Sequence, residues 1–296
     1  MSILKSRILL VSDMHYTTEE TKEELKKIYP DAIASEAAGK AFGYTQTEKV
    51  EKIYEDICEE RSRLGLDAVL ILGDMSLDDY GMRNLPFNYC VKFKEDCLDR
   101  LPCPYYVIPG NHDSYPNDMW KDIFGCDREY VLEFADSIFI MGDVFKGTTV
   151  NGPSAPLDTI DSNMLREALE KYAGKRIFIC AHHVRDEIFS EDCRYLVQNN
   201  SDVVCMFRGH VHQNKVLNFC GKTVFDIGGY CFNGQMINHK YEVNIYDPKW
   251  AWGYQILEIY DDMIKTYHVK PKMRYYATNG IFDIEETIED VYEFTV

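Results

Sequence analysis

The chain has 296 residues, of which 32 are basic and 49 acidic, so its formal net charge is −17. This charge argues against a default role in gripping nucleic-acid backbone and against anchoring on anionic lipid, since both need a basic surface. It leaves room for anionic substrates at a site where bound cations supply local positive charge. Hydrophobic residues make up 46% of the chain, which is enough to bury a large core.

The sequence carries no sign of export or of a membrane segment. It has no run of about 18 apolar residues, and the apolar run at 8–11 is too short for a signal peptide. None of the ten cysteines forms a C-x-x-C pair, which removes the main signal of zinc ribbons and thioredoxin-like proteins. Scattered cysteines without a signal peptide favour buried free thiols in a reducing compartment, so we expect a cytoplasmic protein without membrane contact.

Strands and helices alternate through the first two thirds of the chain. Five short apolar runs end in polar or glycine residues and predict strands buried on both faces, at 8–11, 68–72, 105–108, 177–180 and 203–207. Helical spacing predicts a helix over 48–64, with further candidates over 84–100 and 161–172. Asp161 is a suitable N-cap for the last of these, and Gly174 follows its end. This alternation predicts an α/β sheet.

The last third of the chain has a different pattern. Residues 222–227, 254–260 and 263–269 predict antiparallel strands, with a tight turn at Asp261-Asp262. We therefore expect these strands to form a second sheet packed on the first, with helices outside. Residues 271–296 hold six acidic side chains between Asp283 and Glu293. We expect an acidic, solvated extension there, packed on or trailing from a domain that spans residues 1–270.

Chemically active side chains gather directly after the predicted strands. Six of the eight histidines follow such strands, and so do four side chains with oxygen ligands: His15, His112, His182, His183, His210, His212, Asp13, Asp74, Asn111 and Asp113. Open α/β sheets place their ligand sites at the carboxyl ends of strands. Oxygen and imidazole ligands without thiolate suit Mn, Fe, Zn or Co. The pattern predicts a metal site at this edge.

Each motif alone has an ordinary alternative. Asp13-Met14-His15 and Gly73-Asp74 are common surface turns, Gly110-Asn111-His112-Asp113 fits a simple Asn-Gly turn, and His182-His183 could be a satisfied core pair. Gly209-His210-Val211-His212 is the most specific, because alternate imidazoles on an extended segment point to one side and can meet one metal centre. The ordered combination of all five is far more specific than any member.

This ordered set, D-x-H, G-D, G-N-H-D, H-H and G-H-x-H, resembles the signature of calcineurin-like metallophosphoesterases over residues 8–269. The resemblance implies an α/β fold of four layers, α-β-β-α, with two packed mixed sheets and a two-metal centre at their edge. By resemblance, the first metal is held by Asp13, His15 and His212. The second is held by Asn111, His182 and His210, and Asp74 bridges the two.

The resemblance also implies an activity, that of a metal-dependent phosphoric ester hydrolase. In such an enzyme a water molecule between the two metals becomes the hydroxide nucleophile, and a histidine lies near the leaving group. His112 matches that catalytic histidine and is not expected to be a ligand. Asp113 could accept the second N–H of the His112 ring, and His183 is expected behind the ligands or facing the substrate. The run 75–79 is longer and more acidic than in the family's cyclic-nucleotide phosphodiesterases, so that substrate class is not inferred.

Several alternatives stay open at this point. A non-catalytic metal-binding scaffold or a nuclease could use the same fold, although a nuclease would need a basic groove. The expected substrate is a small-molecule phosphate ester, as a monoester or a diester, and the metal pair and oligomeric state are open. Candidate residues of the substrate walls are Tyr16, Tyr44, Tyr80, Asn84, Asn151, Tyr230 and Asn233.

Overall fold

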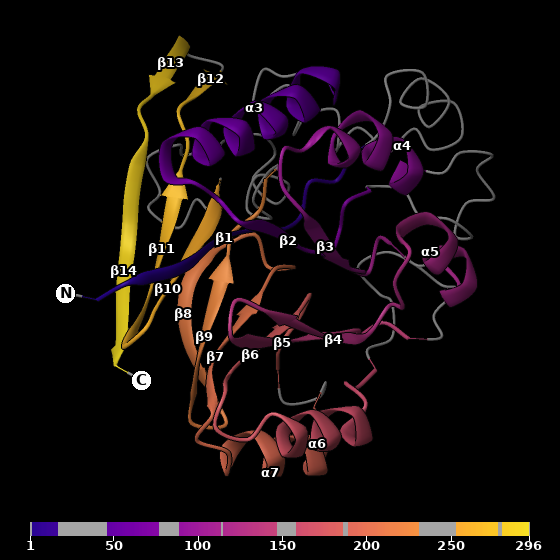
Figure 1. The fold of residues 1–296 in the computed structure, drawn as a ribbon. Coiled ribbons are helices and arrows are strands. Elements are labelled where there is room, and N and C mark those ends of the chain that lie inside the picture. The colour runs from indigo at the N-terminus through magenta and orange to yellow at the C-terminus, as the bar shows by residue number, and fades with distance from the viewer. Residues whose placement is uncertain are drawn as a thin grey trace.

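The computed structural model places two six-stranded sheets face to face, with helices on both outer sides (Figure 1). It describes residues 2–16, 46–76, 89–113, 115–146, 158–185, 189–230, 253–277 and 280–295. This is the four-layer α/β arrangement with two mixed sheets that the family resemblance implies.

The first sheet combines strands from both ends of the chain, in the order β14-β11-β10-β1-β2-β3. Its parallel part is β1 (Leu4–Val11), β2 (Ala68–Leu72) and β3 (Tyr105–Ile108). The other side of β1 pairs with an antiparallel group made of β10 (Tyr254–Tyr260), β11 (Met263–Lys270) and β14 (Thr287–Thr295). A separate two-stranded ribbon joins β12 (Met273–Ala277) and β13 (Gly280–Ile284).

The second sheet is continuous in sequence and has the order β4-β5-β6-β7-β9-β8. Its four central strands are parallel: β5 (Ser137–Gly142), β6 (Arg176–Ala181), β7 (Val203–Arg208) and β9 (Lys222–Ile227). Its two edges are antiparallel: β4 (Tyr130–Phe134) and β8 (Asn214–Phe219).

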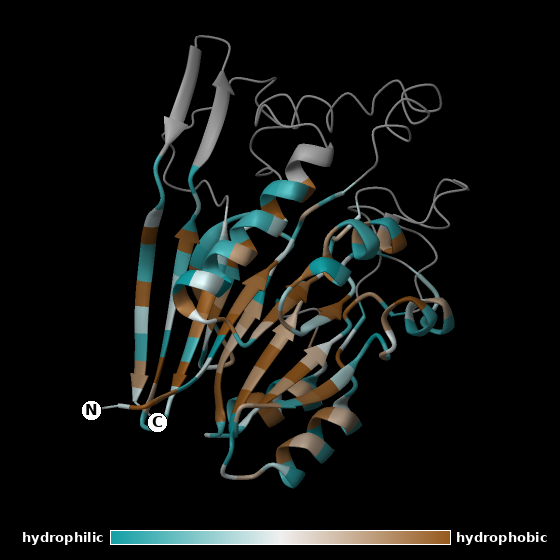
Figure 2. Cartoon of the chain, turned by 45° about the horizontal axis from the view of Figure 1, so that its top comes forward, coloured by the Kyte–Doolittle hydropathy of each residue, from teal (hydrophilic) through white to brown (hydrophobic). Residues whose placement is uncertain are grey.

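Helices cover the outer face of each sheet (Figure 1). The first sheet is covered by α3 (Gln46–Leu64), α4 (Tyr89–Asp96), the short 3₁₀ helix η2 (Leu98–Arg100) and α5 (Asn117–Phe124). The second is covered by α6 (Ser162–Lys171) and α7 (Glu191–Gln198). Hydrophobic residues concentrate on the strands between these layers, and hydrophilic ones on the helices (Figure 2).

Strand β1 shows how the layers arise from the sequence. Successive side chains of a strand point to opposite faces. Leu9 and Val11 therefore pack beneath α3, while Ile8 and Leu10 pack between the two sheets. An uninterrupted apolar run satisfies both faces at once, which is why such runs predicted these strands correctly.

Most of the predicted elements are confirmed. All five strand runs are strands, the helix over 48–64 is α3, and Asp161 caps α6 by accepting from the backbone N–H groups of Asn163 and Met164 at 2.8 and 3.2 Å. The candidate helix over 84–100 is two shorter helices from residue 89 onward, and residues 84–88 lie outside the described ranges.

The expected assembly of the C-terminal strands is wrong. The hairpin β10–β11 joins the first sheet beside β1 instead of starting a second one, and β9 runs parallel to β7. The second sheet is built mainly from residues 130–227, and its first two strands, β4 and β5, had no clear signal in the sequence analysis. A predicted hairpin specifies its own pairing but not the strand it will dock against.

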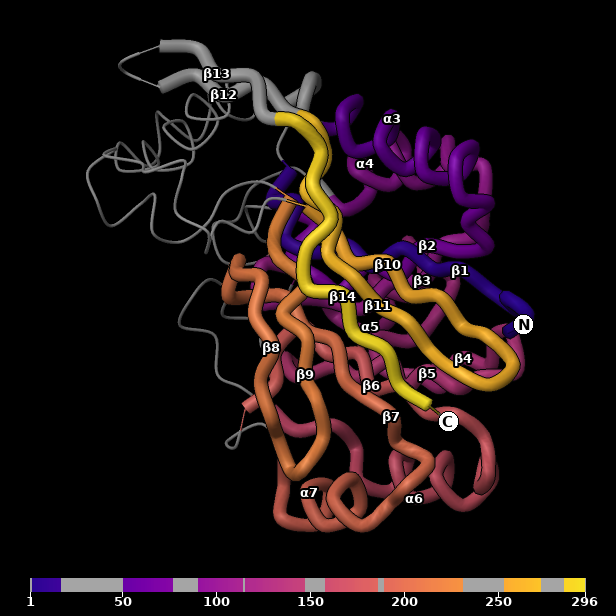
Figure 3. The backbone as a smooth tube through the Cα atoms, turned by 90° about the vertical axis from the view of Figure 1, so that its left-hand side faces the viewer, coloured from indigo at the N-terminus to yellow at the C-terminus, as the bar shows by residue number. Residues whose placement is uncertain are grey.

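The acidic C-terminal segment contributes strand β14, which packs on the sandwich although most of its residues are exposed. Strand β14 pairs with β11, and its Tyr292 and Phe294 pack against the core between the sheets. Tyr292 contacts Phe225 of β9, with ring centroids 5.2 Å apart, and the Asn214 amide donates to Asp290 at 2.9 Å. Strands β14, β8 and β9 therefore lie side by side and close one flank of the sandwich (Figure 3). The domain boundary at residue 270 stays a prediction.

Two further findings concern the cysteines and the helices. The nine cysteines within the described ranges are all free thiols. Across the same ranges, no helix is both long and apolar enough to cross a membrane. The cytoplasmic location expected from the sequence stays a prediction.

Helix α3 buries an acidic side chain against the sheet. Asp56 is 7% exposed and is paired with Lys52 one turn earlier. Burial raises the pKa of Asp56 to about 7, and Lys52 only partly opposes this. The folded protein therefore binds this proton more tightly than the unfolded chain does, so the contribution of Asp56 to stability falls as the pH rises from about 4 to about 7.

We predict that Asp56→Asn stabilises the protein above pH 7. The free energy of unfolding at pH 8 should rise by on the order of 2 kcal/mol, because the amide removes a buried charge. The gain should be smaller at pH 5, where the wild-type carboxyl is already protonated in the folded state. Urea denaturation at both pH values measures this, with the exposed neighbour Glu55→Gln as the control. An equal gain at both pH values would contradict the prediction.

Candidate metal centre

The ten side chains singled out in the sequence converge at one place. They follow the carboxyl ends of five parallel strands, two in the second sheet and three in the first, so the site spans the junction between the sheets. Strand β1 carries Asp13 and His15, β2 carries Asp74, and β3 carries Asn111 to Asp113. Strand β6 carries His182 and His183, and β7 carries His210 and His212.

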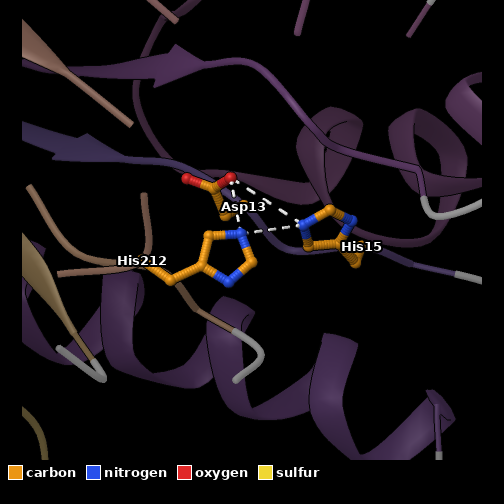
Figure 4. Close-up of side chains that lie close together, drawn as sticks. All are labelled: Asp13, His15 and His212. Atoms are coloured by element: carbon orange, nitrogen blue, oxygen red, sulfur yellow. Dashed lines mark hydrogen bonds and ion pairs between the residues drawn. The ribbon is translucent and has the colours of Figure 1, made fainter. Parts of the chain in front are cut away.

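One group of ligand atoms consists of Asp13, His15 and His212, whose side chains point toward one another (Figure 4). The Nε2 atom of His212 lies 3.0 Å from Asp13 Oδ1 and 3.2 Å from His15 Nε2. The distance from His15 Nε2 to Asp13 Oδ1 is 3.8 Å. Two imidazole nitrogens and a carboxylate oxygen thus face a common point.

A second group forms around Asn111. Its Oδ1 atom lies 2.8 Å from His210 Nδ1 and 3.2 Å from His182 Nε2. The other ring nitrogen of His182, Nδ1, donates to the carbonyl of Leu72 at 2.6 Å. Because a carbonyl can only accept, this bond places a hydrogen on Nδ1 and directs Nε2 into the group, as the neighbours of metal-binding histidines commonly do.

Asp74 connects the two groups. Its Oδ2 atom lies 3.2 Å from His182 Nε2 in the second group and 3.7 Å from His15 Nε2 in the first. Its Oδ1 atom accepts the backbone N–H of His112 at 2.8 Å, which holds the carboxylate in this orientation. A single carboxylate is therefore within reach of both ligand groups.

The backbone at the site is conformationally strained. Five of the residues with ligand atoms have positive φ angles between 46° and 69°: Asp13, His15, Asp74, His210 and His212. Such angles are unfavourable by about 1–2 kcal/mol for a residue with a side chain and persist only where the surroundings enforce them. Here the enforcing bonds run from Asp13 N–H to the Gly73 carbonyl at 3.0 Å and from His210 N–H to Asp13 Oδ2 at 2.9 Å.

This strain corrects one sequence expectation. The segment from Gly209 to His212 is not extended, so its two imidazoles do not share a side. The left-handed turns at His210 and His212 send one ring to Asn111 and the other to Asp13. The two histidines serve different ligand groups.

Glycines allow the strand ends to approach this closely. A Cβ atom on Gly209 would lie 1.9 Å from Ser12 Oγ, and one on Gly110 would lie 2.1 Å from Asp74 Oδ1. Both distances are well inside van der Waals contact. The G-D, G-N-H-D and G-H-x-H motifs thus include glycine because their loops touch one another.

Burial and mutual attraction set the charges of the cluster. Burial favours a raised pKa for Asp13, but His212 and His182 outweigh it and lower that pKa to about 2. Burial likewise opposes ionisation of Asp74, yet His182 and His112 hold its pKa well below the usual range. For His182, Asp74 and Asp13 overcome burial and raise the pKa to about 9. Burial lowers the pKa of His15 well below its usual value.

The donor set fits bound cations. Asp13 and Asp74 are ionised and at most 2% exposed, and they face the His15 imidazole, which burial keeps neutral. Lone pairs that converge without intervening hydrogens repel one another, and a cation removes that repulsion. The oxygen and nitrogen ligands, without a thiolate, suit Mn, Fe, Zn or Co. The residues could hold one cation in each ligand group.

His112 lies beside the cluster rather than within either group. Its ring is half-buried and meets the His15 ring edge-on, with centroids 4.8 Å apart. One of its ring nitrogens comes within 4.8 Å of ligand atoms on His15 and Asp74. His183 packs against the His210 ring, with centroids 4.4 Å apart, and burial lowers its pKa to about 2.

Asp113 binds the loops on either side of the site. Its carboxylate accepts the backbone N–H groups of Met75, Ser76 and Gly110 at 3.0 to 3.1 Å, and the Ser76 hydroxyl at 3.1 Å. Both oxygens are thus engaged by loop atoms, and the expected bond to the His112 ring stays a prediction. Asp113 ties the loop after β2 to the loop after β3, and so it positions Asp74 relative to Asn111.

Two of the suggested substrate-wall residues are core residues instead. Tyr16 is 3% exposed and donates its hydroxyl to Asp96 at 2.7 Å. Tyr230 is 1% exposed and stacks on Tyr254. The remaining candidates lie outside the described residues: Tyr44, Tyr80, Asn84, Asn151 and Asn233.

Two buried arginines that the sequence analysis missed hold the loops of the site. Arg208, at the end of β7, pairs with Asp226 and donates to the carbonyl of Val184. Arg128, just before β4, pairs with Asp143 at 2.7 Å. A charged residue ending an apolar run was a usable signal for Arg208, whereas nothing local to residue 128 pointed to its role.

Comparison with known proteins identifies the family. The sequence model described as calcineurin-like phosphoesterase matches residues 6–214. The chain belongs to the calcineurin-like phosphoesterase family. This match covers every residue of the two ligand groups.

Individual relatives are distant. A probable cyclic nucleotide phosphodiesterase of Coxiella burnetii is 25% identical over 217 residues, which cover 68% of this chain and 80% of the relative. A dimetal phosphatase from Danio rerio has the same fold, with a TM-score of 0.56, 11% identity and coverage of 96% of this chain and 98% of that one. The anchor protein of the Plasmodium inner membrane complex matches with a TM-score of 0.50 and 14% identity, over 97% of this chain and 90% of that one.

We predict that Gly209→Ala weakens metal binding. The added methyl group would displace Ser12 or the neighbouring Asp13 and His210, because its contact distance to Ser12 Oγ is only 1.9 Å. Titration calorimetry of chelator-treated protein with Mn²⁺ should show an affinity at least about 10-fold lower than in the wild type.

The matched control is Gly174→Ala. Gly174 lies far from the ligands, between α6 and β6, and a Cβ atom there meets nothing within 4 Å. Its φ angle is 80°, in the left-handed region, whereas Gly209 is not among the glycines with positive φ. Gly174→Ala therefore introduces backbone strain that Gly209→Ala does not, but it introduces no collision. Equal Mn²⁺ affinity in the Gly209 variant and the control would contradict the prediction.

Proposed function

We propose that the protein is a metal-dependent phosphoric ester hydrolase with a dinuclear centre. The observation that carries the proposal is the position of Asp74, whose carboxylate lies between two complete ligand groups. Two cations held a few ångströms apart by a shared carboxylate form the arrangement that clamps the attacking and leaving oxygens of a displacement at phosphorus. Family membership supports the same reaction class.

The ligands divide between the two positions. Asp13, His15 and His212 would hold one cation, and Asn111, His182 and His210 the other, with Asp74 shared. The neutral amide of Asn111 supplies an oxygen without a further negative charge, so the second position stays attractive to a phosphate anion. When bound, the two cations would supply the positive charge that polarises the ester and lowers the pKa of an attacking water molecule.

His112 would act on the substrate side of the centre. Its half-buried ring lies next to His15 and Asp74 without belonging to either ligand group as assigned above. From there it can donate a hydrogen bond to a phosphoryl oxygen or protonate the departing alkoxide. The bond from its backbone N–H to Asp74 Oδ1 couples the position of the ring to the shared carboxylate.

The substrate is proposed to be a small phosphate ester, and a diester is favoured. The Coxiella relative is named a probable cyclic nucleotide phosphodiesterase, which supports a diester as the scissile group. The net charge of −17 argues against a long nucleic acid as substrate. We propose Mn, Fe, Zn or Co as the metals.

A non-catalytic scaffold is the second candidate. The Plasmodium protein shares the fold and is described as an anchor, so this fold does not by itself imply catalysis. The complete pair of ligand groups and the neighbouring His112 favour the hydrolase.

The deciding assay is hydrolysis by the metal-loaded chain. A panel of aryl phosphomonoesters, aryl phosphodiesters and cyclic nucleotides should be tested with Mn²⁺, Zn²⁺, Co²⁺ and Fe²⁺, after metal analysis of protein purified without chelator. Turnover of a diester that stops on chelation supports the proposal. Two bound metals without turnover of any ester would favour the scaffold.

We predict that Asp74→Asn and His112→Ala fail in different ways. Asp74→Asn should disturb both cation positions, so both Mn²⁺ binding and turnover should fall. His112→Ala should keep both binding events and lower kcat by about 10²–10⁴-fold, the usual range for a general acid–base group. Calorimetry and steady-state kinetics on the same preparations separate the two effects. Wild-type kcat in the His112 variant would refute the assigned role.

A further inference from the structure

A single buried guanidinium joins the two sheets beside the site. Arg128 is 7% exposed, and its Nε and Nη2 atoms donate to the two carboxylate oxygens of Asp143 at 2.7 and 3.4 Å. Its remaining bonds go to backbone carbonyls: Nη1 donates to Asp113 at 3.3 Å and to Tyr115 at 2.5 Å, and Nη2 donates to Phe145 at 3.4 Å. The guanidinium thus holds five acceptor atoms on two loops.

These two loops belong to different layers. Asp113 and Tyr115 follow β3 of the first sheet, and Asp113 comes directly after Asn111 and His112 in the sequence. Residues 143–145 follow β5 of the second sheet. Asp143 is only 1% exposed, so the guanidinium is also the partner that makes its burial tolerable.

Phe145 connects the pair of Arg128 and Asp143 to two of the candidate metal ligands. Its N–H donates to Asp143 Oδ1 at 2.8 Å and its carbonyl accepts from Arg128, so both backbone groups of this residue are held by the pair. Its buried ring lies against His182 and His210, with centroid distances of 5.8 and 6.2 Å. The pair of Arg128 and Asp143 thereby fixes the position of the phenyl ring against which both imidazoles pack.

We propose that Arg128 is a positioning residue that sets the affinity of one of the two cations, the one assigned to Asn111, His182 and His210. The inference rests on the proposed function for that assignment. Its contacts lead to this ligand group through Phe145 on one side and through the backbone after Asn111 on the other. Arg128 should affect only this one binding position, because the ligand group of the other position is held by β1 and by the turn at His212.

Lysine cannot replace arginine in this role. An ammonium group has three donors at a single point, whereas the guanidinium spreads its five donors in a planar fork that spans two loops. Groups that orient metal ligands from behind typically change metal affinity by about 10–100-fold when replaced. Arg128→Lys should therefore weaken one binding step by about that factor while preserving the buried charge.

The test is a calorimetric titration of chelator-treated protein with Mn²⁺. Asn111→Ala identifies the binding step of the second ligand group, and His212→Ala identifies the step of the first. In Arg128→Lys, the Mn²⁺ affinity of the step that Asn111→Ala abolishes should fall by about 10–100-fold. The Mn²⁺ affinity of the step that His212→Ala abolishes should change by less than about 3-fold. The absorption bands of the Co²⁺-loaded protein should change in the same variant, since they report ligand geometry.

The control is Arg7→Lys, which perturbs an equivalent pair elsewhere. Arg7 donates to Glu258 at 2.8 Å and to the carbonyl of Leu64, but it lies on β1 well before the end that carries Asp13. Arg7→Lys should lower the stability of the fold about as much as Arg128→Lys does, and it should leave both Mn²⁺ affinities unchanged. If Arg128→Lys fails to fold, Phe145→Leu tests the same route, because it removes the ring that backs His182 and His210.

The outcomes separate this inference from the proposed function. Unchanged binding in folded Arg128→Lys, or an equal loss of both steps that Arg7→Lys reproduces, would overturn the role of Arg128. Wild-type protein that binds two Mn²⁺ ions but hydrolyses no ester would overturn the proposed function alone, and the titration would still decide the role of Arg128. Wild-type protein that binds no Mn²⁺ would overturn both.

Discussion

The structure depends on the close approach of buried carboxylates and imidazoles whose charges must be compensated. Two ionised carboxylates and four imidazoles converge within 3 to 4 Å in a place from which water is largely excluded. A buried charge without a partner is strongly destabilising, so these groups can stay together only if protons or cations compensate them. The rest of the fold around the site, from the sheet junction to the strained turns, serves to hold this arrangement.

The backbone conformation and the contacts between loops hold these side chains in place. Five left-handed residues aim side chains in directions that a regular strand end cannot reach, and glycines let the turns after β2, β3 and β7 meet without collision. Asp113 and Arg128 then fasten neighbouring loops together through their main-chain atoms. Rigid support of this kind keeps ligands in place before any cation arrives, which lowers the reorganisation that binding requires.

Much of the fold and of the candidate site could be predicted from the sequence. The features that could not be predicted were missed for physical reasons. Apolar runs located five strands, and the rule that parallel strands end at one edge brought Asp13, Asp74, Asn111, His182 and His210 together correctly. The left-handed turns at His210 and His212 were missed because no local pattern distinguishes them from an extended segment. The docking of β10 against β1 and the bonds of Arg128 were missed because both are long-range pairings, and sequence spacing contains no information about such partners.

The pairing of β1 with β10 has a consequence for how the protein is made. Leu4 lies opposite Tyr260 in that pair, so the strand that leads to Asp13 and His15 keeps one edge open until residue 260 has left the ribosome. Contacts so distant in sequence form slowly, and unpaired strand edges invite association with other chains. Nascent chains of this protein should therefore rely on chaperones to shield that edge, and the candidate metal centre should become complete only after β10 has been synthesised.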